Sequence, residues 1–135
     1  MRNVLMIIVC LCLAACHCPI SNNDVMRANF GQKPTNEEAA YKARKHFEQV
    51  LIDPDSLKLG CSQEIKKGWT REYQCGPATL GYLVLCNVNA KNRYGGYTGN
   101  KLFAVIINGT GVSAINLNEF PNREMNRGWF VGYTE

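Results

Sequence analysis

Side chains able to do acid–base or nucleophilic chemistry are few in this sequence. It contains two histidines, His17 and His46. Neither belongs to a G-x-S-x-G, H-E-x-x-H or paired Cys/His pattern, the arrangements that organise common hydrolytic sites. His46 adjoins Phe47 in a segment with helical periodicity, which is the usual setting of a structural histidine. We therefore expect no catalytic residue, no metal and no cofactor, and we interpret the protein as a non-enzyme.

A glycine-rich run, Gly95-Gly96-Tyr97-Thr98-Gly99-Asn100-Lys101, has the composition of a phosphate-binding loop. A P-loop needs Gly-Lys-Ser/Thr in direct succession and leads into a helix. Here Asn100 separates Gly99 from Lys101 and a strand-like run follows, so we reject that interpretation. Glycine instead permits close approach by another chain, and tyrosine is typical of binding hot spots. The predicted binding loop consists of Tyr94, Gly95, Gly96, Tyr97, Thr98 and Gly99.

The same run has a purely structural interpretation. It would then be a rigid crossover between two strands, with its tyrosines packed on a helix. Asn87, Asn89 and Asn92 suit either role, because asparagine side chains fix loops by bonding to nearby backbone groups.

Two carboxylates stand close together in Asp53-Pro54-Asp55-Ser56. A calcium site needs six or more oxygen ligands, and no D-x-D-x-D-G continuation follows. We predict a turn in which Asp or Ser side chains bond to the backbone.

The chain begins with a short basic stretch, Met1-Arg2-Asn3, followed by an apolar run from Val4 to Ala15. That run is shorter than the about 20 residues of a membrane-spanning helix and has the length of an export signal. Its end, Leu13-Ala14-Ala15-Cys16, resembles the lipobox of bacterial lipoproteins. The resemblance implies diacylglyceryl transfer to Cys16, cleavage before it and acylation of the new amino terminus, including palmitate. An ordinary secretory signal is the alternative.

The acyl chains on Cys16 would together supply more than the two membrane-binding signals that stable anchoring needs. His17, not Asp, follows the anchor cysteine. By analogy with enterobacterial sorting, we expect the outer membrane, facing the periplasm, rather than inner-membrane retention. The formal net charge of +4 is spread along the chain without a Lys/Arg block, so we expect no nucleic-acid partner.

Of the seven cysteines, Cys10 and Cys12 leave with the signal and Cys16 takes the lipid. Cys18, Cys61, Cys75 and Cys86 remain, an even number typical of disulfides in an oxidising compartment. Their spacing lacks the close C-x2–4-C pair of structural zinc sites.

A capping box, Thr35-Asn36-Glu37-Glu38, opens a run with helical spacing of apolar residues. The sequence predicts an amphipathic helix over 36–52, ended by Asp53-Pro54. The preceding residues, 16–34, are mostly polar and predict a lipidated tether; an ordered arm that uses Val25, Met26 and Phe30 is the alternative.

Strand-like runs occupy the rest of the chain. Leu57–Lys66 and Trp69–Cys75 predict a hairpin around Lys67-Gly68, which would place Cys61 opposite Cys75. We therefore expect a Cys61–Cys75 disulfide, with Cys75–Cys86 as the alternative. Cys18 would then be free, or bonded to whichever cysteine remains. Further strands are predicted over 80–89, 101–108 and 112–115, with an Asn-Gly turn between the last two. The aromatic tail, 129–133, predicts a closing strand or an exposed contact patch.

These elements predict a signal peptide over 1–15, a tether over 16–34 and a single α+β domain over 35–135. In that domain one N-terminal amphipathic helix packs on a four- or five-stranded antiparallel sheet.

Two segments resemble a family of small, largely uncharacterised exported bacterial proteins. One is Leu51-Ile52-Asp53-Pro54-Asp55-Ser56, similar to a helix end of the form L-x-D-P-D-S. The other is the run over 88–99, similar to V-N-A-K-N-x-Y-G-G-Y-T-G. The resemblance covers roughly 39–107 and implies a shared fold without an assigned activity.

We expect a membrane-anchored, non-catalytic accessory protein of the cell envelope that contacts an envelope protein through Tyr94–Lys101. The alternative is a periplasmic binder of a small ligand or glycan, with Tyr94, Tyr97 and Trp129 around a pocket.

Overall fold

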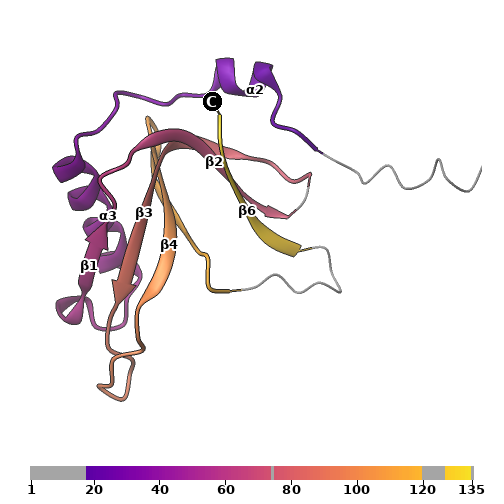
Figure 1. Cartoon of the computed structure of the whole chain (residues 1–135). Helices are drawn as coiled ribbons and strands as arrows, with labels where there is room; N and C mark the ends of the chain where they lie inside the picture. The colour runs from indigo at the N-terminus through magenta and orange to yellow at the C-terminus, as the bar shows by residue number, and fades with distance from the viewer. Residues whose placement is uncertain (1–17, 74, 120–126, 135) are drawn as a thin grey trace, which may run out of the picture.

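The computed structural model describes residues 18–73, 75–119 and 127–134. The protein has an α+β fold in which an N-terminal helix packs on a six-stranded antiparallel sheet (Figure 1). The predicted α+β class is confirmed, and the sheet has one strand more than the four or five that were predicted. The elements are α2 (Asn22–Arg27), α3 (Asn36–Val50), the 3-10 turn η2 (Pro54–Ser56), β1 (Lys58–Cys61), β2 (Lys66–Tyr73), β3 (Thr79–Asn89), β4 (Lys101–Asn108), β5 (Gly111–Asn116) and β6 (Arg127–Tyr133).

Strand β3 is the centre of the sheet. The strand order is β5-β4-β3-β2-β6, and β1 also pairs with β3. One edge of β3 pairs with β4 from Tyr82 to Val88. Its other edge pairs first with β2 and then with β1, so three strands depend on β3 for their hydrogen bonds.

Helix α3 begins as predicted. Thr35 Oγ1 accepts a hydrogen bond from the Glu38 amide, and the Glu38 carboxylate accepts one from the Thr35 amide. The helix ends at Val50 because Leu51 already has an extended backbone. Its buried face is small, with Ala39, Ala43 and Phe47 against the sheet.

Both faces of the sheet carry apolar side chains. The face under α3 includes Tyr82, Val84, Cys86 and Val88 from β3, together with Phe47 of the helix. The opposite face holds a smaller cluster of Leu83, Ala104, Ile106 and Ile115, against which Leu85, Leu117 and Val131 pack. The middle of β3, Leu83–Cys86, is a continuous apolar run because this part of the strand is covered on both faces.

The predicted hairpin around Lys67-Gly68 is wrong. Strands β1 and β2 run in the same direction along β3, separated by a break at residues 62–65. Gly68 lies inside β2, opposite Gly81 of β3. A Cβ at Gly68 would lie 2.7 Å from the Gly132 carbonyl oxygen, so this glycine permits close strand approach and makes no turn.

The disulfide predictions are also wrong, both Cys61–Cys75 and Cys75–Cys86. The structure contains Cys61–Cys86 and Cys18–Cys75. Cys61 lies directly opposite Cys86 in the β1–β3 ladder, which follows from β1 pairing with β3 rather than with β2. Two disulfides indicate a location outside the cytoplasm, where thiols are not kept reduced.

The described part of the predicted tether, 18–34, lies against the domain instead of hanging free. It forms α2, and Cys18 is bonded to Cys75. Phe30 packs edge-on against Tyr82 with ring centroids 6.0 Å apart, as the ordered-arm alternative expects. The Asn29 carbonyl accepts a hydrogen bond from the Gly109 amide at 2.9 Å.

The other strand predictions are confirmed. Strand β4 turns into β5 at a tight hairpin in which Asn108 pairs with Gly111. The tail forms β6, an edge strand that pairs with β2. The side chain of Trp129 lies outside the described set. Among described residues, no helix has the length and hydropathy needed to cross a bilayer.

Replacement of Gly81 by alanine is expected to destabilise the sheet. The added Cβ would lie 2.6 Å from the Ile107 carbonyl oxygen and 2.6 Å from Ile106 Cγ2, so the backbone must shift. Overpacking of this kind lowers the free energy of unfolding by about 1–3 kcal/mol, measurable by urea denaturation. Gly60→Ala is the control, since a Cβ at Gly60 meets nothing within 4 Å. Equal stability of the two variants would contradict the close approach at Gly81.

Candidate functional site

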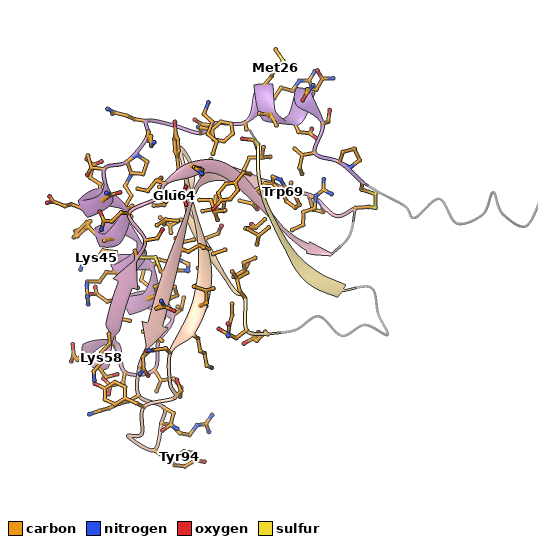
Figure 2. All side chains as sticks on the ribbon, viewed as in Figure 1. Met26, Lys45, Lys58, Glu64, Trp69 and Tyr94 are labelled. Atoms are coloured by element: carbon orange, nitrogen blue, oxygen red, sulfur yellow. A yellow bond between two sulfur atoms is a disulfide. The ribbon has the colours of Figure 1, made fainter. Side chains whose placement is uncertain are left out.

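The candidate site is the loop that joins β3 to β4, residues 90–100. It projects from one end of the sheet, with Tyr94 at its tip (Figure 2). The loop is a short extension of the β3–β4 hairpin, because Lys91 and Tyr97 form an antiparallel bridge. Thr98 closes its base by donating backbone and side-chain hydrogen bonds to the Ala90 carbonyl.

Asn92 organises the tip. Its Oδ1 accepts hydrogen bonds from the amides of Tyr94 at 2.9 Å and Gly96 at 3.2 Å. Its backbone amide donates to the Gly96 carbonyl, and its carbonyl accepts from the Gly95 amide. Of the three asparagines expected to fix the loop, Asn92 alone has such side-chain bonds within the described structure. Asn87 is exposed, and Asn89 Oδ1 is buried without a partner there.

Two of the loop glycines are required by backbone geometry. Gly95 has φ +81° and Gly99 has φ +87°, in the left-handed region that favours glycine. Gly96 has neither a positive φ nor a close neighbour on its Cβ side, so it leaves open surface beside Tyr97.

The body of the domain holds the loop through η2. The Lys91 amide donates to Ser56 Oγ at 2.8 Å, and Ser56 Oγ in turn donates to the Asp53 carbonyl at 2.7 Å. The predicted turn over 53–56 is therefore present. It also joins the two sequence segments that were singled out by resemblance, which lie far apart in the chain.

The two tyrosines of the loop differ in their surroundings. Tyr94 is 87 % exposed, which contradicts the expectation that the loop tyrosines pack on the helix. Tyr97 is 44 % exposed and lies close to two ammonium groups, with Lys58 Nζ 4.2 Å and Lys91 Nζ 5.6 Å from its ring centroid. These contacts are cation–π interactions, which favour this position of the ring.

Positive charge gathers around the loop. Lys58, Arg93 and Lys101 are exposed and Lys91 is half-buried. None of the four forms a salt bridge within the described residues, where the ion pairs are Lys45–Glu48 and Lys66–Glu64. This exposed end of the domain therefore combines aromatic side chains with cations that form no salt bridge within the described residues.

Sequence reasoning identified the loop but missed three residues that complete it. Lys58 carries no local signal, because it becomes a neighbour of Tyr97 only when β1 pairs with β3. Lys91 lies within the loop and reaches Tyr97 through their antiparallel bridge. Ser56 was recognised only as a turn residue. Its bond to Lys91 depends on how η2 packs beside the sheet.

Two hollows elsewhere on the described surface do not include the loop tyrosines. The larger, about 760 Å³ and open to solvent, is lined by residues that include Cys18, Arg27, Arg71 and Cys75. A smaller groove lies beside His46 on α3, between Tyr41 and Val112. Burial lowers the pKa of His46, whose ring lies edge-on to Phe47 with centroids 5.5 Å apart.

The strand order places the backbone next to Trp129 and the tyrosine loop at opposite ends of β3, which disagrees with the predicted pocket around Tyr94, Tyr97 and Trp129. The backbone next to Trp129 pairs with the end of β2 that faces the start of β3, since Val131 lies opposite Thr70 and Thr70 opposite Thr79. The tyrosine loop follows the other end of β3.

Within the described residues, no group of three His, Cys, Asp or Glu side chains is arranged to hold a metal ion.

Comparison of the chain with protein-family models, with curated proteins and with solved structures found no match.

Asn92→Ala is expected to loosen the tip of the loop without unfolding the domain. It removes two hydrogen bonds, each contributing about 0.5–1.5 kcal/mol, from an exposed turn. Amide exchange at Tyr94 and Gly96 should accelerate about 5–30-fold, as measured by NMR hydrogen exchange. Asn87→Ala, which removes no such bond, is the control. Unchanged protection in the Asn92 variant would show that other contacts order the tip.

Proposed function

We propose that the protein is a lipid-anchored accessory protein of the bacterial envelope that binds a protein partner through the loop Tyr94–Lys101. The observation that supports this most directly is the exposed Tyr94 ring at the tip of an ordered loop. Hydrogen bonds to Asn92 already order the backbone that carries this ring, so binding costs little loop entropy, which favours the use of Tyr94 as an interface anchor.

Charge indicates the kind of partner. The loop is surrounded by Lys58, Lys91, Arg93 and Lys101. The turn that Ser56 joins to Lys91 carries two acidic residues, Asp53 and Asp55. Complementary potentials guide specific association. An acidic face of an envelope protein therefore fits this surface best.

The anchor is supported by the sequence Leu13-Ala14-Ala15-Cys16 and by the two disulfides, which agree with export. With His17 after the lipidated cysteine, the outer membrane's periplasmic leaflet is the proposed location. A glycan-binding role has less support. It requires a hollow beside stacked aromatic rings, and neither hollow described above is lined by Tyr94 or Tyr97.

Cys16→Ser is expected to abolish lipid attachment, because the thiol is the acylated group. Metabolic labelling with palmitate and mass spectrometry of the mature amino terminus measure this directly. Cys18→Ser should still be labelled and is the matched control. Palmitate incorporation that persists in the Cys16 variant would refute the proposed anchor.

Photo-crosslinking in cells tests the partner. A benzophenone amino acid in place of Tyr94 should give a discrete adduct with one envelope protein. The same replacement at Tyr41, an aromatic on α3 that is 62 % exposed, should not. Arg93→Glu should lower the Tyr94 adduct several-fold, while Lys42→Glu on α3 leaves it unchanged, because only the first reverses charge at the interface.

Absence of an adduct from Tyr94 in a folded, acylated protein would refute the loop as the interface. An adduct of equal yield from both positions would show that the contact is not specific to the loop.

A further inference from the structure

We propose that the end of the domain formed by Cys18, α2 and the β2–β3 turn rests on the lipid surface, so that the tyrosine loop points away from the membrane. This orientation rests on the proposed lipid attachment at Cys16.

The connection between lipid and domain is very short. Cys18 is bonded to Cys75, at the turn between β2 and β3. Consecutive Cα atoms are 3.8 Å apart, so the Cα of Cys16 lies at most about 7 Å from that of Cys18. The Cys18 carbonyl also accepts a hydrogen bond of 2.7 Å from the Arg71 guanidinium. A lipid at Cys16 therefore holds this turn next to the headgroups.

The segment after Cys18 is fixed to the same end of the sheet. Asn29 bonds to Gly109 at the β4–β5 turn, and Phe30 packs on Tyr82. In the antiparallel register, Tyr82 near the start of β3 pairs with Ile107 near the end of β4, so the β2–β3 and β4–β5 turns share one end. The anchored surface is thus a rigid part of the domain.

The chemistry of this end suits a phospholipid interface. Met26 on α2 is 83 % exposed and points away from the sheet (Figure 2). Arg27 follows it and is exposed, and Arg71 lines the hollow beside Cys18. An exposed apolar side chain beside a cation suits the boundary between headgroups and acyl chains, and basic groups are attracted to anionic headgroups. Asp24 is the one acidic residue among the described lining of that hollow.

The tyrosine loop lies at the opposite end of the sheet (Figure 1). Strand β3 begins at Thr79, close to the anchored turn, and ends at Asn89, where the loop starts. At about 3.3 Å per residue this strand spans about 33 Å. The orientation therefore presents the proposed contact surface well clear of the bilayer, toward a partner in the adjoining compartment.

Lipid quenching of a fluorescent residue measures the orientation. The acylated protein is reconstituted in phosphatidylethanolamine–phosphatidylglycerol vesicles that contain a headgroup nitroxide lipid. An environment-sensitive fluorescent amino acid replaces Met26 or Tyr94 in separate variants. Quenching at Met26 should be several-fold stronger than at Tyr94. Equal quenching at both positions, or stronger quenching at Tyr94, would overturn the orientation.

A second variant tests whether the short connection is the cause. A flexible Gly/Ser insert of about twelve residues, spanning about 20 Å, is placed between His17 and Cys18. It keeps the lipid site and both disulfides, and quenching at Met26 should fall toward the value at Tyr94. Unchanged quenching would overturn the role of the Cys18–Cys75 bond in orienting the domain.

Mass spectrometry of the same samples separates this inference from the proposed function. An unacylated chain would remove the anchor and with it the orientation. An acylated chain with equal quenching at Met26 and Tyr94 would overturn the orientation alone, and the loop could still bind its partner.

Discussion

Backbone pairing along β3 is the constraint on which the rest of the structure depends. Three strands bond directly to β3, and the two outer strands, β5 and β6, reach it through β4 and β2. Because both faces of β3 are covered, its side chains also join the two apolar clusters. The Cys61–Cys86 bond joins β1 to this strand at the fully buried Cys86, so it secures β1, a strand of only 4 residues.

The two ends of β3 have different chemistry. At its start, the disulfide to Cys18 and the packing of Phe30 bind the N-terminal segment to the domain. At its end, the chain leaves the sheet in a loop that Asn92 and Ser56 hold in place. Rigid attachment at one end and an ordered aromatic tip at the other are what a membrane-bound contact protein requires. The two proposals therefore follow from a single feature of the topology.

The elements that were predicted correctly are those that form through interactions between residues close in sequence. The capping box, the apolar spacing of α3 and the Asn-Gly turn before β5 act between residues close in sequence, and each appears as expected. The loop over 90–100 was also recognisable, because its glycines and Asn92 satisfy a turn within a few residues of one another. In these segments the conformation that local interactions favour is the one found in the folded domain.

The sequence by itself determined the class of the fold, the helix, most strands and the position of the exposed loop. Tertiary structure alone decided the partners of the four described cysteines, the direction of β1 relative to β2 and the approach of Lys58 to Tyr97. Gly68 shows why: a glycine suits a turn as well as a close approach between strands, and only the presence of Gly81 and Gly132 beside it distinguishes the two. Once β1 pairs with β3, Cys61 faces Cys86 and Lys58 reaches Tyr97, contacts that no short stretch of sequence encodes.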